Sequence, residues 1–118
     1  RPGVDPLGPD NVLVFAPGLL CGTPGPGLNR FTVAAKSPLS GGYGESEAGG
    51  FWGAELKRSG YDAIIVEGKA DEPVYLWIKD GRPEIRDARN LWGLDVAETE
   101  KAIRQVLEAA EDRVKKTA

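Results

Sequence analysis

A glycine-rich segment from Lys36 to Gly53 is the part of the chain best suited to bind an anion. Six of its residues are glycine, and glycine permits positive φ angles and close approach of a ligand to the main chain. The segment leads into a helix-like stretch, Ala54–Lys57, whose N-terminus would add unpaired N–H groups and partial positive charge. A phosphate-bearing ligand is therefore one hypothesis. The spacing is neither a Walker A motif nor a dinucleotide fingerprint, and it leaves a purely structural cluster of turns equally open.

Three charged residues near this segment are candidates for binding or acid–base chemistry. Arg30 follows a Pro/Gly-rich stretch, and its planar guanidinium could hold a phosphate or carboxylate, although most arginines in such places are simply solvated. Glu45 and Glu47 flank Ser46 and could bind a divalent cation or transfer protons. On an exposed loop, such carboxylates are more often only solvated.

Side chains that commonly bind metals or act as nucleophiles are scarce. The chain contains no histidine and one cysteine, Cys21. Without a second thiol or an imidazole beside it, Cys21 is expected to be buried and inert, and its isolation favours a reducing, cytoplasmic location. Enzymatic chemistry would therefore have to come from carboxylates, from a cofactor or from parts outside this sequence.

The composition is that of a globular protein. The chain has 118 residues, 41% of them hydrophobic and 28% charged, with a net charge of −3. We expect a single domain over residues 1–118. The absence of a basic excess argues against a nucleic-acid partner, and no apolar run is long enough for a membrane span.

Apolar runs bounded by glycine and proline predict five short strands. Ala63–Glu67 has the pattern of a buried strand, and Asp80-Gly81 predicts a tight hairpin. The predicted strands are Asn11–Ala16, Phe31–Ala35, Ala63–Glu67, Val74–Lys79 and Pro83–Arg86.

Two helices complete the prediction. The first spans about Phe51 to Ser59 and ends at Gly60. The second runs from Val96 to about Ala110, begins with a capping box, and carries an apolar face expected to meet a core. The fold class predicted is α+β: a mixed, mainly antiparallel β-sheet with a short helix after the glycine-rich segment and a C-terminal amphipathic helix.

A series of stretches in order along the chain resembles the N-terminal domain of the aldehyde ferredoxin oxidoreductase family. The resemblance runs from about Val4 to Val106. The stretches that carry it include Gly22-Thr23-Pro24, Arg30-Phe31-Thr32-Val33, Lys36-Ser37-Pro38-Leu39-Ser40-Gly41, Gly49-Gly50-Phe51-Trp52-Gly53-Ala54-Glu55-Leu56-Lys57, Gly60-Tyr61-Asp62-Ala63-Ile64 and Leu91-Trp92-Gly93.

This resemblance implies a bis-pterin enzyme containing tungsten or molybdenum, with the N-terminal domain as a β-saddle beneath the pterins. Arg30 matches the family arginine between pterin and cluster. Glu47, Ala48 and Gly49, with Gly50 beside them, match the loop that holds the pterin phosphates and their bridging Mg²⁺ by main-chain groups. The implied metal ligand is the main-chain carbonyl of Glu47, at a position where the family often has asparagine.

The resemblance also implies partners that this sequence does not contain. The family converts aldehydes to carboxylic acids and passes electrons through a [4Fe–4S] cluster to ferredoxin. One cysteine cannot ligate such a cluster, so the cluster is expected only in the full-length enzyme, on its remaining domains. The chain alone is expected to be inactive. A non-enzymatic phosphate-binding or assembly module derived from that domain is the alternative, and self-association into a homo-oligomer is left open.

Overall fold

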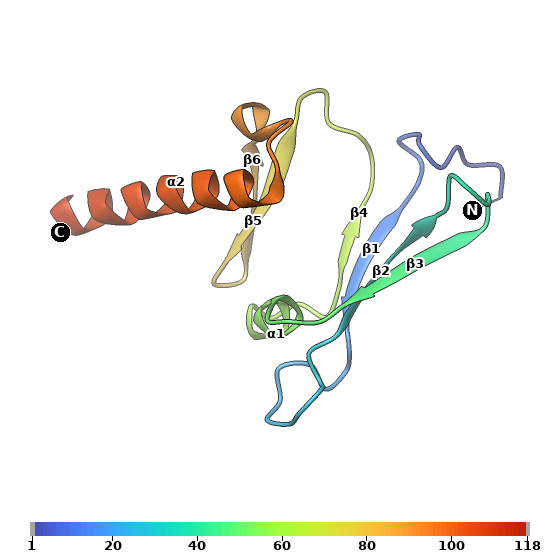
Figure 1. Ribbon diagram of the computed structural model, residues 1–118, viewed down its shortest axis with the longest axis horizontal. Helices are drawn as coiled ribbons and strands as arrows, with labels where there is room; N and C mark the ends of the chain where they lie inside the picture. The colour runs from blue at the N-terminus through green and yellow to red at the C-terminus, as the bar shows by residue number, and fades with distance from the viewer. Residues whose placement is uncertain (1, 118) are drawn as a thin grey trace. The chain divides into compact units, whose positions relative to one another are not determined.

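The computed structural model describes residues 2–117, with side chains described as far as Ala110 (Figure 1). Its two helices and mainly antiparallel sheets confirm the predicted α+β class. The elements are β1 (Leu13–Pro17), β2 (Phe31–Lys36), β3 (Tyr43–Ala48), α1 (Trp52–Arg58), β4 (Ile64–Val66), β5 (Val74–Lys79), β6 (Arg82–Asp87), a 3-10 turn (Arg89–Leu91) and α2 (Val96–Thr117).

The chain divides into two compact units. The first contains the residues up to Asp71 together with Trp77–Glu84, and the second contains Glu72–Leu76 and the chain from Ile85 onward. The four-stranded sheet and α1 belong to the first unit, and α2 belongs to the second. All the residues expected to bind an anion therefore lie in the first unit.

The first unit is built on an antiparallel sheet with strand order β3-β2-β1-β4. Phe15 of β1 pairs with Val33 of β2 on one side and with Ile64 of β4 on the other. Because side chains alternate along a strand, these three residues share one face of the sheet. The strands predicted at residues 11–16, 31–35 and 63–67 are confirmed, with bounds shifted by no more than two residues.

Helix α1 packs on this face through its first turn. The ring of Trp52 lies 4.4 Å from that of Phe31 and 5.8 Å from that of Phe15, measured between centroids. Gly53 makes room for a thiol, because a Cβ there would lie 2.8 Å from the Sγ of Cys21. The buried hydrophobic side chains described in this unit are Cys21, Ala54 and Leu56.

The predicted stop at Gly60 is confirmed by the hydrogen bonds that end α1. Gly60 has a φ of +96°. Its N–H donates to the carbonyl of Lys57 at 3.0 Å, and the N–H of Tyr61 donates to the carbonyl of Leu56 at 3.4 Å. This is the Schellman arrangement, in which a left-handed residue, usually glycine, closes a helix.

A third of the glycine-rich segment is a strand, which corrects its interpretation as a loop. Residues 43–48 form β3, whose pairs with β2 run from Lys36 with Tyr43 to Phe31 with Ala48. The turn between the strands is closed by the N–H of Ser37, which donates to the carbonyl of Gly42 at 2.8 Å. Gly41 and Gly42 therefore form the turn of a hairpin. The polar sequence of β3 is explained by its position at the edge of the sheet.

Strand β4 is less buried than its apolar sequence predicted. Ile65 is 64% exposed and Val66 is 41% exposed. β4 is the other edge of the sheet, and the pairing of Ile65 with Val14 puts it on the face opposite to α1. An apolar run predicts a strand here but does not reveal that Ile65 is largely exposed.

The β5–β6 hairpin turns as predicted. Asp80 has a φ of +50° and Gly81 a φ of +75°. Two successive positive φ values match a type I′ turn, whose twist suits paired strands. The hydroxyl of Tyr61 donates to the carbonyl of Gly81 at 2.6 Å, which ties the turn to the end of α1 within the first unit.

The capping box of α2 is confirmed, but its expected core is not found. The N–H of Glu98 donates to the carboxylate of Asp95 at 2.8 Å, and the N–H of Asp95 donates to Glu98 at 3.3 Å. The helix continues to Thr117, beyond the predicted end near Ala110. None of its side chains described up to Ala110 is buried.

Gly53→Ala is expected to lower the free energy of unfolding by about 1–3 kcal/mol, because the added Cβ would overlap the Sγ of Cys21. Helix propensity alone predicts the opposite sign, since alanine is favoured over glycine by about 1 kcal/mol. Urea denaturation would measure the change. Gly49→Ala is the control, because a Cβ there meets no atom within 4 Å. Equal stability of the two variants would contradict the expectation.

Candidate functional site

Strands β2 and β3 bring the predicted anion-binding residues to one end of their hairpin. Arg30 immediately precedes β2, Glu47 and Ala48 end β3, and Gly49–Gly50 lead toward α1 (Figure 1). The antiparallel register pairs Thr32 with Glu47. Residues widely separated in sequence therefore meet where β2 begins and β3 ends, and we define this group as the hairpin-end site.

An ion pair connects the two charged members of the hairpin-end site. Nη1 of Arg30 donates to Oε2 of Glu47 at 3.0 Å. Arg30 and Thr32 lie on the same face by alternation, so the contact is a diagonal pair across the two strands. The side chains of Arg30 and Glu47 are 71% and 52% exposed, so water reaches both groups.

The main chain of Glu47 faces the open edge of the sheet. Hydrogen-bonded and non-hydrogen-bonded pairs alternate along antiparallel strands. The bond from Ser37 to Gly42 makes theirs a hydrogen-bonded pair, and alternation from there makes Thr32 and Glu47 a non-hydrogen-bonded pair. Since β3 is the outermost strand, the N–H and C=O of Glu47 point away from β2.

The two glycines that follow β3 leave the main chain accessible. A Cβ built on Gly49 or Gly50 would meet no heavy atom within 4 Å, and Gly50 has a φ of +93°. Helix α1, which begins just beyond them, has only seven residues and no side-chain cap at Phe51. Because so short a helix has a small dipole, α1 adds little positive charge to the hairpin-end site.

The other carboxylate of β3 has a different partner. The hydroxyl of Tyr43 donates to Oε2 of Glu45 at 2.7 Å. This hydrogen bond favours the neutral phenol and raises the pKa of Tyr43 above its ordinary value, with desolvation and repulsion from Glu45 adding to it. Glu45 and Glu47 are thus engaged separately. Within the described residues, no three His, Cys, Asp or Glu side chains form a metal-binding group.

Cys21 is buried, as expected. It is 4% exposed, and its Sγ lies 3.9 Å from Oδ1 of Asn29. The same amide oxygen accepts a hydrogen bond from the N–H of Gly22 at 3.2 Å. Cys21 therefore fills space beneath α1, where it holds the loop that precedes β2.

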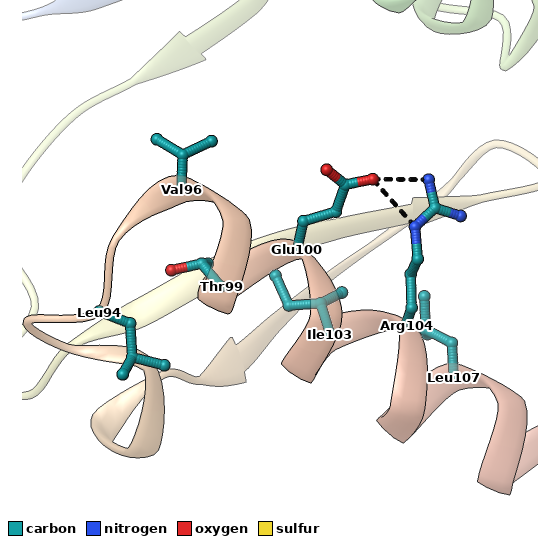
Figure 2. Close-up of a pocket in the computed structure, with 7 residues that line it drawn as sticks. All are labelled: Leu94, Val96, Thr99, Glu100, Ile103, Arg104 and Leu107. Atoms are coloured by element: carbon teal, nitrogen blue, oxygen red, sulfur yellow. Dashed lines mark hydrogen bonds and ion pairs between the residues drawn. The ribbon is translucent and has the colours of Figure 1, made fainter.

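An apolar groove runs along α2 in the second unit (Figure 2). One flank carries an ion pair, in which Arg104 donates to Oε1 of Glu100 at 2.8 and 3.0 Å. Among the residues whose side chains are described, no other charged side chain lines the groove. No helix in the described part of the chain, α2 included, is long and apolar enough to cross a membrane. The residues lining the groove are Leu94, Val96, Thr99, Glu100, Ile103, Arg104 and Leu107.

Sequence reasoning missed the contact between Arg30 and Glu47. It assigned Glu47 to a loop, where the side chain has no defined neighbour. From Tyr43 to Ala48, larger side chains alternate with small ones, and this period of two was the available signal for a strand. Recognising that strand would have placed Glu47 beside the start of β2.

A family model and several curated proteins match this chain. The model described as "Aldehyde ferredoxin oxidoreductase, N-terminal domain" matches residues 1–116. The "Tungsten-containing aldehyde ferredoxin oxidoreductase" of Pyrococcus furiosus is 53% identical over 97% of this chain and 18% of its own length. The "Aliphatic sulfonate oxidoreductase, WOR-like subunit" of the same organism is 44% identical over 85% of this chain and 16% of its own length.

A solved structure extends the similarity to the fold. The "Active site complex BamBC of Benzoyl Coenzyme A reductase in complex with 1,5 Dienoyl-CoA" contains a chain that is 48% identical, with a TM-score of 0.86. The match covers 89% of this chain and 16% of that one. The chain therefore spans less than a fifth of the length of each of these three relatives. Their names describe different activities.

Glu45→Gln is expected to lower the pKa of Tyr43 toward its ordinary value, because the substitution removes the carboxylate that holds the phenolic proton. Tyrosinate absorbance followed during an alkaline titration would measure the change, and Tyr43→Phe would identify the contribution of this tyrosine. Glu47→Gln removes the same charge from the same strand without touching the phenol. Equal pKa shifts in the two glutamine variants would show that general repulsion, rather than the hydrogen bond, is responsible.

Proposed function

This chain belongs to the family of aldehyde ferredoxin oxidoreductase N-terminal domains, and from that premise we propose that it is part of a pterin-binding domain. Residues 1–118 would form a single, partial domain of an oxidoreductase that converts aldehydes to carboxylic acids. The enzyme would transfer the electrons to ferredoxin. The observation that chiefly supports this proposal is the hairpin-end site. There the guanidinium of Arg30, the outward-facing edge of β3 and two accessible glycines adjoin one another.

The hairpin-end site is suited to an anionic cofactor that carries phosphate. Arg30 is exposed and presents a planar fork that matches phosphate oxygens. The N–H of Glu47 and the main chain of Gly49 and Gly50 are accessible donors of the kind that bind phosphates through backbone groups. Ala48, whose main-chain groups face β2, would hold the end of β3 against β2 and so position Glu47 and the two glycines.

The main-chain carbonyl of Glu47 is the group that we propose for Mg²⁺ between the pterin phosphates. Carbonyl oxygen is a suitable ligand for a hard cation, and this carbonyl faces outward from the sheet edge. The carboxylate of the same residue already contacts Arg30. The main-chain carbonyl and the side-chain carboxylate of Glu47 would thus have separate roles.

The tungstopterin or molybdopterin would supply the redox chemistry when bound, and this chain would supply positioning and charge. Arg30 would stabilise negative charge on the cofactor, and the main chain from Glu47 to Gly50 would fix its phosphates. The [4Fe–4S] cluster and the aldehyde-binding channel would belong to the remaining domains. We therefore propose that the isolated chain is inactive and that the enzyme acts in the cytoplasm, where a lone thiol stays reduced.

Arg30→Ala in the full-length enzyme is expected to reduce retention of the metal and pterin by about tenfold or more, since hydrogen bonds to charged groups contribute about 1.5–3 kcal/mol. Metal analysis and pterin fluorescence after gel filtration would measure both components. Arg58→Ala is the matched control, because Arg58 is also an exposed arginine in an ion pair, with Glu55 at 2.7 Å. Full retention in the Arg30 variant would contradict its proposed role.

Absence of metal and pterin from the full-length wild-type protein would contradict the cofactor assignment as a whole. That result would favour the alternative of a non-enzymatic module that binds phosphate ligands or assembles with other proteins. The control for this measurement is a related enzyme loaded under the same growth conditions with tungstate and molybdate supplied.

A further inference from the structure

The carboxylate of Glu47 contacts one of the guanidinium N–H groups of Arg30 that could bind an anionic ligand. Nη1 of Arg30 and Oε2 of Glu47 are 3.0 Å apart, the distance of a charge-assisted hydrogen bond. A phosphate group held by the fork of Nη1 and Nη2 would need the same Nη1 group, because carboxylate and phosphate oxygens both match that fork. The Glu47 carboxylate and such a phosphate group would therefore compete for the guanidinium of Arg30.

The contact is weak enough to be exchanged. Both side chains are more than half exposed, at 71% for Arg30 and 52% for Glu47. Exposed ion pairs are screened by water and contribute little to stability. The register of β2 and β3 holds both residues in place whether or not their side chains touch. Breaking the contact therefore requires side-chain rotation and no change in the strands.

Glu45 is not an equivalent competitor, although it lies on the same strand and the same face. Its Oε2 accepts a hydrogen bond from Tyr43 at 2.7 Å. Glu45 is paired with Ala34, one step farther along that face from Arg30 than Glu47, which is paired with Thr32. The geometry thus singles out one of the two carboxylates.

We propose that Glu47 is an internal competitor for Arg30 that a phosphate-bearing ligand displaces, and that it thereby sets the affinity of the hairpin-end site. This inference rests on the proposed function, since it assumes that the site binds phosphate groups. It adds a role for the Glu47 side chain that is separate from any role of its main-chain carbonyl. Glu47 is a positioning residue in this account, because it acts through Arg30.

Calorimetric titration of the chain with inorganic pyrophosphate, at fixed low ionic strength and without divalent cations, tests the proposal. Glu47→Gln is expected to lower the Kd about two- to fivefold, in keeping with the strength of exposed ion pairs. Glu45→Gln removes the same charge from the same strand and is expected to change the Kd less. In an Arg30→Ala background, Glu47→Gln is expected to cause no tightening.

The outcomes separate this inference from the proposed function. An equal decrease in the Kd for pyrophosphate in Glu45→Gln and Glu47→Gln would overturn the competition, because only the general charge of the strand would then matter. The anion site itself would remain supported. Weaker binding by Glu47→Gln would also overturn it, since Glu47 would then assist the ligand. If neither the wild-type chain nor Glu47→Gln binds pyrophosphate, both the competition and the phosphate-binding part of the proposed function fail. Circular dichroism would establish that each variant is folded.

Discussion

The pairing of β2 with β3 is the constraint on which the hairpin-end site depends. It sets Thr32 opposite Glu47, and from this single register follow two separate properties. The Glu47 side chain reaches Arg30 diagonally, and the Glu47 main chain faces away from the sheet. A slip of one residue would reverse both, since successive residues of a strand alternate in side-chain face and in hydrogen-bonding direction.

The packing of Trp52 and Gly53 fixes the far end of the same segment. Trp52 lies against Phe15 and Phe31, and the missing side chain of Gly53 admits the thiol of Cys21. Between this anchor and the last pair of β3 lie only a few residues, Gly49 and Gly50 among them. Two glycines held between a strand and a packed helix keep their accessible main chain in a restricted space, which favours ligand binding over a fully mobile loop.

The sequence predicted most elements because their signals are local. The hairpin at Asp80-Gly81, the glycine that ends α1 and the capping box at Asp95 each depend on a few adjacent residues. Strand β3 was not predicted, since its polar residues are stabilised by pairing with a distant strand rather than by burial. The exposure of Ile65 was unpredictable for a similar reason, because it depends on what covers a face of the sheet.

The hairpin-end site was predicted only in part. Arg30 and the glycines were identified from residue type and from the family resemblance, and these positions do lie together in the structure. The partner of Arg30 could not be identified, because a contact between residues far apart in the chain requires the register. Local sequence thus indicates which residues could bind an anion, whereas the pairing of strands decides which of them interact.

The charge balance at Arg30 depends on how much water surrounds it. In this chain the guanidinium and the carboxylate of Glu47 are both exposed, so their attraction is weakened by solvent. Any ligand or domain that covers the site would exclude water and strengthen every interaction of Arg30. A phosphate group carries more charge than a carboxylate, so both its attraction to Arg30 and its desolvation cost would be larger. Covering the hairpin-end site would therefore strengthen the pairing of Arg30 with the anion that it contacts, while the desolvation of both charges would oppose that gain.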